Sequence, residues 1–344
     1  MKTTGAERAD ASAPIVRGTP LPVVAPARMA RPPGVRPVRR AGRALLARLG
    51  SAASRVLPAL GLTVAMTTAS AAERVTLPSL DAGATGAVEL VGWWFAAPAV
   101  GAAGAASEPA VAARRAPAVA LFHGCNGAYA PRSQRLTRQM LDYAAFFNAQ
   151  GLHALVVDSM RPRRVVEVCT RGRGEQPAVT IAARRLDALG AVAWLATRAD
   201  VDSRRIGIVG FSHGGSTVLA AVNRRDPAVA AAPAQPAFAV AFYPGCAPAR
   251  RHGFEAALPL LILIGDADDW TPAAPCVALV AEARGVRPQI ELYPGAAHAF
   301  DIDAALRFRT DVSNGVDRAG VHVGRDESAA RASRERLAAF VAAF

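Results

Sequence analysis

The chain has 344 residues, a formal net charge of +13, 52% apolar residues and four cysteines. A chain of this length and apolar content can bury a large core, which excludes intrinsic disorder for its body and a disulfide-built miniprotein. The high net charge would suit a polyanionic partner such as nucleic acid, so the position of the charge decides what it means.

The positive charge is concentrated at the N-terminus. Residues 1–71 hold eleven of the 40 basic residues but two of the 27 acidic ones, so they carry +9 and residues 72–344 carry +4. Within this segment a basic stretch, 39–55, precedes an apolar stretch, 56–66, and a small-residue site at 69–71. This order is typical of a secretory signal peptide, and the apolar stretch is too short to span a bilayer.

We therefore expect residues 1–71 to form a disordered N-terminus and a signal peptide cleaved near Ala71 and Ala72. Residues 72–344 are expected to form a single exported domain, periplasmic or secreted, with no membrane span once the signal is removed. An amphipathic surface helix is the alternative for the apolar stretch. Because most of the charge lies in the segment that is removed, nucleic acid is not an expected partner. The start site (Met1 or Met29) and the export route stay open.

From residue 86 onward, apolar runs of strand length alternate with helical patterns. Most runs are continuously apolar, as in strands that helices cover on both faces. The alternation predicts an α/β fold with one mostly parallel, doubly wound sheet and helices on both faces. The expected strands are residues 87–95, 118–123, 154–158, 206–210, 239–243, 260–264 and 289–293. The expected helices are residues 133–150, 178–197, 216–223, 275–284 and 327–343, and a surface loop is expected at 98–117.

A glycine-rich turn stands between the fourth expected strand and the helix after it. Its sequence at 210–215, GFSHGG, matches the Gly-x-Ser-x-Gly pattern in the strand–turn–helix context that gives this pattern its meaning. Such a turn is strained and lifts the serine hydroxyl to the sheet edge, at the amino end of the helix. Ser212 is therefore the candidate nucleophile, and a glycine-rich turn with an incidental serine is the alternative.

A serine nucleophile needs a base and a group that orients the base, and in this architecture both follow the serine in the chain. The sixth expected strand runs into GDADDWTP, which places a carboxylate at the end of that strand. A histidine, His298, follows the last expected strand. These positions predict a catalytic triad of Ser212, Asp268 and His298. Asp269 stays open as an alternative acid.

The negative oxygen of a tetrahedral intermediate needs preorganised N–H donors. The backbone N–H of His213 is one candidate, because it directly follows the nucleophile. The second is expected in the loop after the strand 118–123, where HGCNG (123–127) forms a glycine-flanked turn. We assign it to the N–H of Cys125. An ordinary glycine turn is the alternative.

Together these motifs resemble those of the dienelactone hydrolase-like family of the α/β-hydrolase superfamily. The resemblance covers roughly residues 86–344, and it implies the α/β-hydrolase fold and hydrolysis of ester or lactone bonds. The founding members have cysteine as the nucleophile where this chain has Ser212, so the resemblance supports hydrolysis rather than one particular lactone. It is carried by residues 123–127, Asp158-Ser159 with Arg161, the helix 184–195 with Asp187, and residues 210–215, 243–246, 265–272 and 298–300.

Export would allow the four cysteines to form disulfides, and the sequence alone leaves three pairings open. In the fold that the resemblance implies, the strands that precede Cys125 and Cys169 are neighbours, as are those that precede Cys246 and Cys276. The implied disulfides are therefore Cys125–Cys169, which would brace the oxyanion loop, and Cys246–Cys276. No cofactor is expected, and no metal site is expected because the cysteines lack the spacing of metal ligands.

The substrate is less well determined than the reaction. Arg161, like Arg163 and Arg164, is a candidate for binding a substrate carboxylate, with solvated loop charge as the alternative. Trp270 and Phe300 are candidates for lining the pocket, with core packing as the alternative. The sequence thus predicts a serine hydrolase of small-molecule carboxylic esters or lactones that works through an acyl-enzyme. A peptidase, an acyltransferase and a non-catalytic binding protein of this fold stay open, as does the oligomeric state.

Overall fold

The described part of the fold lies within one unit of the chain, Thr63–Phe344. The expected signal peptide and most of the expected 98–117 loop lie outside the described residues, so the domain boundary near Ala72 stays a prediction. The computed structural model describes residues 72–82, 88–98, 115–172, 174–175 and 177–344.

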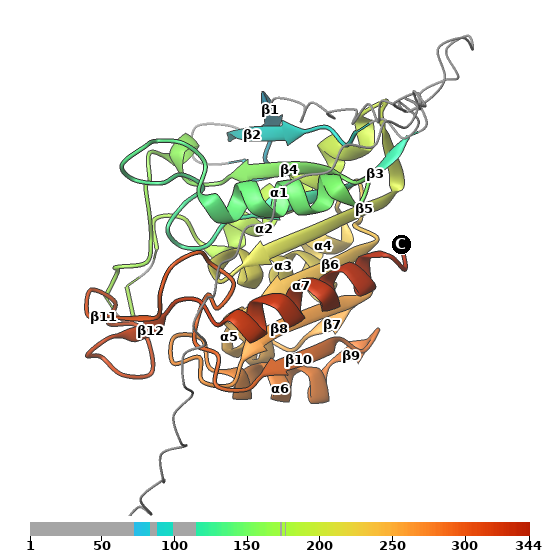
Figure 1. The fold of residues 1–344 in the computed structure, drawn as a ribbon. Helices are drawn as coiled ribbons and strands as arrows, with labels where there is room; N and C mark the ends of the chain where they lie inside the picture. The colour runs from blue at the N-terminus through green and yellow to red at the C-terminus, as the bar shows by residue number, and fades with distance from the viewer. Residues whose placement is uncertain (1–71, 83–87, 99–114, 173, 176) are drawn as a thin grey trace, which may run out of the picture. The chain divides into compact units, whose positions relative to one another are not determined.

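An eight-stranded sheet forms the centre of the described fold (Figure 1). Its strands are β1 Glu73–Pro78, β2 Glu89–Phe95, β3 Ala116–Phe122, β4 His153–Asp158, β5 Val201–Phe211, β6 Phe238–Phe242, β8 Leu260–Gly265 and β10 Gln289–Tyr293. The spatial order is β1-β2-β4-β3-β5-β6-β8-β10. The pairs from β4 to β10 are parallel, whereas β2 is antiparallel to both β1 and β4. The carboxyl ends of the parallel strands therefore share one edge of the sheet.

Helices cover both faces of this sheet, as expected for a doubly wound fold. The long helices are α1 Arg138–Ala149, α2 Ile181–Thr197, α3 His213–Val222, α6 Ala273–Glu282 and α7 Glu327–Val341. In Figure 1, α1 and α7 lie on one face of the sheet, and α2, α3 and α6 lie on the other. The side chains of Thr137, Thr180 and Asp326 cap α1, α2 and α7 by accepting a backbone N–H of the first turn. The mostly parallel, doubly wound sheet is therefore confirmed.

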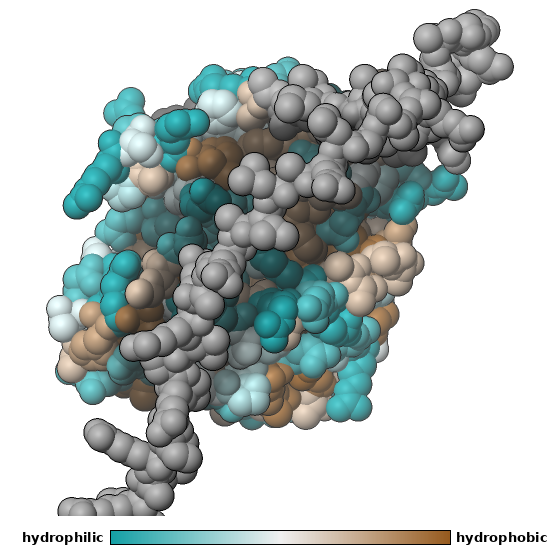
Figure 2. All heavy atoms as spheres, viewed as in Figure 1, coloured by the Kyte–Doolittle hydropathy of each residue, from teal (hydrophilic) through white to brown (hydrophobic). Residues whose placement is uncertain are grey.

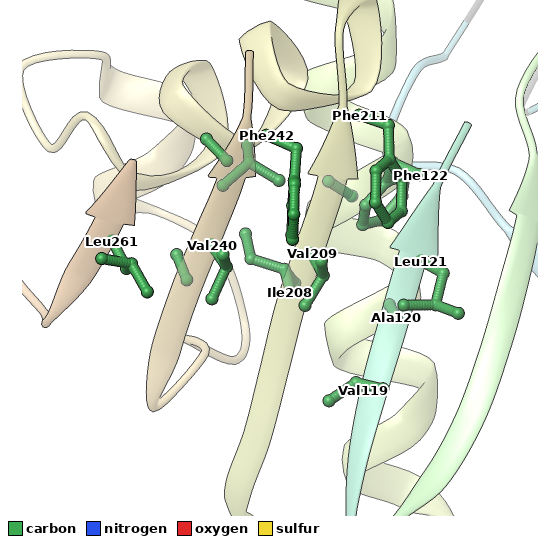
Figure 3. Close-up of a cluster of buried hydrophobic side chains, with 14 of the residues drawn as sticks. Val119, Ala120, Leu121, Phe122, Ile208, Val209, Phe211, Val240, Phe242 and Leu261 are labelled. Carbon is green, nitrogen blue, oxygen red and sulfur yellow. The ribbon is translucent and has the colours of Figure 1, made fainter. Parts of the chain in front are cut away.

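Aromatic side chains fill the core at the carboxyl ends of the central strands. Figure 3 shows Phe122, Phe211 and Phe242 on three strands of the sheet, above the aliphatic side chains of the same strands. The Phe211 ring lies 5.0 Å from the Phe242 ring and 4.5 Å from the Tyr143 ring of α1, measured between centroids. Each such pair adds about 0.5–1.5 kcal/mol to the apolar burial. Since Phe211 directly precedes Ser212, this cluster holds the strand end from which the candidate nucleophile leaves.

All expected strands and long helices are present, with shifts at their ends. The largest shifts are in α1, which begins at Arg138 rather than at 133, and in β5, which begins at Val201 rather than at 206. The helix α3 begins at His213 rather than at 216. The short elements escaped the sequence patterns because two to six residues are too few to show a period. They are the edge strand β1, the 3-10 helix Arg161–Arg163, α4 Pro227–Ala230, α5 Cys246–Arg251, β7 Glu255–Ala256, β9 Arg284–Gly285, β11 Arg307–Arg309 and β12 Val321–Val323.

The β11–β12 hairpin lies in the segment between β10 and α7. It carries exposed apolar side chains at Leu306, Phe308 and Val316, and hydrophobic colour gathers over this region at the lower left of Figure 2. Its second strand contacts the last loop of the sheet, because the Gly324 N–H donates to the His298 carbonyl at 3.1 Å. The hairpin thus belongs to the edge of the sheet that holds the candidate site. No helix within the described ranges is long and apolar enough to span a membrane.

Candidate active site

The turn between β5 and α3 holds Ser212 in a strained conformation. Its φ of 55° and ψ of −113° are costly for a residue with a Cβ atom. The Ser212 N–H donates to the Phe242 carbonyl at 2.9 Å, and the Ser212 carbonyl accepts the Ser216 N–H at 2.8 Å. The turn is thus secured on one side by β6 and on the other by the first turn of α3.

Two glycines allow β5, α3 and β3 to meet at this turn. A Cβ atom on Gly214 would lie 2.0 Å from the Phe122 carbonyl oxygen, and one on Gly210 would lie 2.1 Å from the Gly214 carbonyl oxygen. Because the Cβ atoms would clash with backbone atoms, rotation of a side chain could not relieve the clash. The glycines of the motif are therefore required by the close approach of three backbone segments.

A continuous chain of hydrogen bonds links Ser212, His298 and Asp268. The Ser212 Oγ lies 2.9 Å from His298 Nε2, and His298 Nδ1 lies 2.8 Å from Asp268 Oδ2. His298 and Asp268 are buried, at 2% and 4% exposed. Because a carboxylate only accepts, His298 Nδ1 carries the proton and Nε2 is free to accept the hydroxyl proton of Ser212. This arrangement can turn a serine hydroxyl into a nucleophile.

The Asp268 carboxylate is itself held by several donors from its own loop. Its Oδ1 accepts the backbone N–H of Trp270 at 3.0 Å and that of Thr271 at 2.7 Å. The Thr271 hydroxyl lies 3.0 Å from Asp268 Oδ2 and 3.1 Å from His298 Nδ1. The loop therefore fixes the orientation of the carboxylate toward the imidazole.

The carboxylate of Asp269, the alternative acid, binds His322 and not His298. Its Oδ2 lies 2.7 Å from His322 Nδ1, and its Oδ1 accepts the His322 backbone N–H at 2.8 Å. Asp269 thus binds the β11–β12 hairpin, whereas Asp268 reaches His298. The structure brings together the three residues of the expected triad and leaves the alternative outside.

A buried polar cluster supports the His298 ring and was not found from the sequence. The Tyr243 ring lies 4.8 Å from the His298 ring, and the Tyr243 hydroxyl donates to Asp301 at 2.7 Å. Asp301 also accepts from the Tyr143 hydroxyl at 2.8 Å and from the Gln139 amide. Burial, followed by the Asp301 carboxylate, raises the pKa of both tyrosines well above its ordinary value, so both stay protonated donors. Residues this far apart in the sequence carry no local motif.

The loop after β3 lies against the Ser212 turn. A Cβ atom on Gly124 would lie 3.7 Å from the Ser212 Cβ, and Cys125, the next residue, lines the same cavity as Ser212. The Cys125 carbonyl accepts the Val168 N–H at 2.8 Å, and Cys125 is joined to Cys169 by a disulfide. The segment that follows β4 and the 3-10 helix thus restrains this loop through a backbone hydrogen bond and a disulfide. The second disulfide, Cys246–Cys276, is also present, so both pairings implied by the resemblance occur in the structure.

A buried arginine binds the side chain of His213, the residue that follows Ser212. Arg184 is fully buried; it donates to His213 Nδ1 at 2.7 Å and to the His123 carbonyl at 2.8 Å. Burial lowers the pKa of Arg184 to about 10, so it stays charged at neutral pH. Because arginine only donates, His213 Nδ1 accepts and its Nε2 carries the proton. Burial and then Arg184 lower the pKa of both His123 and His213 well below its usual value.

A cavity of about 630 Å³ opens beside Ser212. Cys125, His213 and Trp270 line it, as does Arg171, which sequence reasoning missed. The Trp270 ring lies 4.8 Å from the His298 ring. A cavity of this size is typical of sites for small-molecule ligands.

The structure does not bring Arg161 to this cavity. Its guanidinium lies 3.6 Å from the centroid of the Tyr129 ring and lines a separate hollow. Arg163 pairs with Asp187 at 2.8 Å, which explains it as a structural ion pair. Phe300 is fully buried in the core rather than in the cavity wall. Of the candidate substrate-binding residues, Trp270 is the one that lines the cavity.

Within the part of the chain that the structure describes, no cluster of three or more histidine, cysteine, aspartate or glutamate side chains could hold a metal ion.

A sequence model of the dienelactone hydrolase family matches residues 103–344. The chain belongs to the dienelactone hydrolase family. Its fold is the α/β-hydrolase fold, and it is a hydrolase of ester-type bonds. No curated protein sequence matches the chain at a significant level.

Two solved structures illustrate the likeness of this dienelactone hydrolase family member. A candidate dienelactone hydrolase from Klebsiella pneumoniae subsp. pneumoniae is 17% identical, with a TM-score of 0.52, over 80% of this chain and 99% of that chain. A dienelactone hydrolase-like promiscuous phosphotriesterase from metagenomic libraries is 17% identical, with a TM-score of 0.50, over 79% and 98% of the two chains. At this identity the likeness shows the shared fold.

The buried neutral histidines predict a loss of stability below about pH 6.5, the ordinary histidine pKa. The unfolded chain takes up protons there, whereas folded His123 and His213 stay neutral, so the free energy of unfolding falls as the pH falls. Each contributes up to about 1.4 kcal/mol per pH unit. Urea unfolding between pH 6.5 and pH 5 measures this slope. His213→Gln, which keeps an acceptor for Arg184, is expected to reduce it, and an unchanged slope would contradict the assignment.

Proposed function

We propose that the protein is a serine hydrolase that cleaves carboxylic ester or lactone bonds through Ser212, His298 and Asp268. The proposal rests on the unbroken chain of hydrogen bonds from the Ser212 hydroxyl to the Asp268 carboxylate. Family membership supports ester-type hydrolysis. The strained turn and the adjoining cavity supply what the chemistry also needs, a nucleophile at the cavity wall and room for a small substrate.

In the first half of the reaction, His298 Nε2 takes the proton of Ser212 as the Ser212 Oγ forms a bond to the carbonyl carbon. Asp268 keeps the imidazole in the required tautomer and stabilises its positive charge. The carbonyl oxygen becomes an oxyanion, for which we assign the backbone N–H groups of Cys125 and His213 as donors. Collapse of this intermediate breaks the bond to the alcohol oxygen, which receives the proton from His298.

In the second half, water replaces the alcohol. His298 removes a proton from water as the water oxygen attacks the acyl-enzyme carbonyl. The second tetrahedral intermediate uses the same N–H donors. Its collapse releases the carboxylic acid and returns the proton to Ser212, so no cofactor is needed. For a lactone the alcohol and the acid are two ends of one product.

Substitution of each carboxylate in turn tests whether Asp268 or its neighbour Asp269 is the catalytic acid. Asp268→Asn is expected to lower kcat for a p-nitrophenyl ester on the order of 10³- to 10⁴-fold, because the imidazole loses its orienting carboxylate. Asp269→Asn is the matched control and is expected to stay within about threefold of the wild type, since that residue binds His322. If Asp269→Asn lowered kcat more than Asp268→Asn, the catalytic acid would be Asp269 and not Asp268.

Covalent labelling tests the nucleophile directly. A fluorophosphonate probe is expected to add to Ser212, as located by peptide mass spectrometry, and Ser212→Ala is expected to lose labelling and at least about 10⁴-fold in kcat. A Ser212→Ala protein that still hydrolyses esters would refute the proposal. A folded wild type that neither reacts nor hydrolyses would favour a binding protein of the same fold.

The two disulfides predict different effects on activity. Replacing either pair by serine is expected to cost about 3–4 kcal/mol of stability, since the loops of 44 and 30 residues are similar in length. At a temperature where both variants are folded, loss of Cys125–Cys169 is expected to lower kcat at least about tenfold, because it frees the loop with the Cys125 N–H. Loss of Cys246–Cys276 is the control and should leave kcat near the wild-type value. Equal kcat values in the two variants would show that the Cys125–Cys169 disulfide does not brace the loop with the Cys125 N–H.

We also assign the protein to an exported, periplasmic or secreted location. Two disulfides favour an oxidising compartment, and residues 39–71 have the order of a signal peptide. The protein recovered from the periplasm or the medium of an expressing bacterium is expected to begin at Ala72, as read by N-terminal sequencing. Retention in the cytoplasm with the N-terminal segment intact would contradict this assignment.

A further inference from the structure

The cavity beside Ser212 continues along the length of α3. Ser212, Ser216, Ala220 and Asn223 line it, at spacings of four, four and three residues. Such spacings place side chains on one face of a helix. The exposed face of α3 is thus one wall of a channel that begins at the candidate nucleophile.

Two other helices contribute walls to this channel. Ile181 and Ala182 contribute from the first turn of α2, and Pro248 and Ala249 contribute from α5. With Ala220, these side chains are apolar and mostly small, which leaves space for a chain between the helices. The hydroxyl of Ser216, the polar side chain in this stretch of α3, is bonded to the Ser212 carbonyl and to the Gly245 N–H. The middle of the channel therefore offers mainly apolar contact.

The length of the channel follows from the helix that lines it. Residues 212 and 223 are eleven positions apart, so at a rise of 1.5 Å per residue the channel extends about 16 Å along α3. An extended hydrocarbon chain with carbon–carbon bonds of about 1.5 Å advances roughly 1.25 Å per carbon. The last carbon atom stays about 4 Å from the groups that close the far end. Roughly 12 Å is then left for the chain, which is enough for about ten carbon atoms beyond the reacting carbonyl.

Polar side chains close the far end. Arg185 and Asp226 form an ion pair with a distance of 2.5 Å, and both line the cavity. The Asn223 amide donates to the Gly253 carbonyl at 2.9 Å, and its oxygen accepts the Glu255 N–H at 3.0 Å. An apolar chain that reached these polar groups would have to desolvate an ion pair. The polar end thus sets an upper limit on chain length.

We propose that this channel selects esters in which one half is an unbranched apolar chain of about ten carbon atoms. The inference rests on the serine hydrolase function proposed above and adds the substrate class. Each methylene that enters the channel is transferred from water to an apolar wall, which raises kcat/KM by up to about fourfold. The rise ends where the chain meets Arg185 and Asp226.

Two series of p-nitrophenyl and alkyl esters test the chain-length dependence. In one series the acyl chain grows from two to fourteen carbons with p-nitrophenol as the leaving group. In the other the alcohol chain grows over the same range with an acetyl group. In one of the two series kcat/KM is expected to rise to a maximum near ten carbons and then to fall. A flat or steadily falling profile in both series would overturn the proposal.

Blocking substitutions locate the chain in the channel. Ala220→Phe fills the middle of the channel and is expected to lower the ratio of kcat/KM for the ten-carbon ester to that for the two-carbon ester at least tenfold. Ala182→Phe, at the exposed rim, is expected to lower the same ratio and serves if Ala220→Phe fails to fold. Ala339→Phe, at an exposed position of α7, is the matched control and should leave the ratio unchanged. A ratio equal to that of the control in both blocking variants would overturn the proposal.

The same assays separate this inference from the function on which it rests. Ser212-dependent hydrolysis of the two-carbon ester with no preference for chain length would refute the channel and retain the serine hydrolase. Absence of ester hydrolysis together with absence of fluorophosphonate labelling would refute both.

Discussion

The positive φ of Ser212 is the constraint on which the rest of the site depends. A strained residue persists only where its surroundings hold it, and here three strands and a helix do so. The glycines on either side let β5, α3 and β3 approach to distances that a Cβ atom would forbid. The aromatic cluster around Phe211 packs beneath the turn. The hydroxyl is thereby placed where the later loops of the sheet can bring an imidazole to it.

Much of this arrangement could be predicted because the fold concentrates it in short motifs at strand ends. Ser212 stands in a glycine pattern whose meaning depends on its strand and helix, and Asp268 and His298 follow the expected strands directly. The spacing of residues along the sequence favoured Asp268 but left Asp269 as an alternative acid. The choice depends on His322, which lies far along the chain and whose imidazole binds the Asp269 carboxylate.

The parts that sequence could not supply are those built by tertiary contact. Arg171 was missed as a cavity residue, whereas Arg161 was favoured because it follows a strand at the right edge; its guanidinium instead packs on Tyr129. The Asp301 cluster joins α1, β6 and the loop after β10, and its members have no common spacing. Short elements such as β11 and β12 contain too few residues to show a period.

The base and the tip of the β11–β12 hairpin differ in how much sequence change they can tolerate during evolution. Its base is tied to the loops that carry His298 and Asp268, since Gly324 binds the His298 carbonyl and His322 binds Asp269, next to Asp268. Between β11 and β12, Asn314 accepts the Trp270 indole N–H and lines the cavity. The Val316 N–H donates to the Asp269 carbonyl at 2.8 Å, whereas residues 317–319 are exposed. Insertions at 317–319 would enlarge the tip at little cost to the base, whereas a change in register between the two strands would displace it. Selection for new substrates can therefore act on the hairpin tip while its paired strands are inherited unchanged.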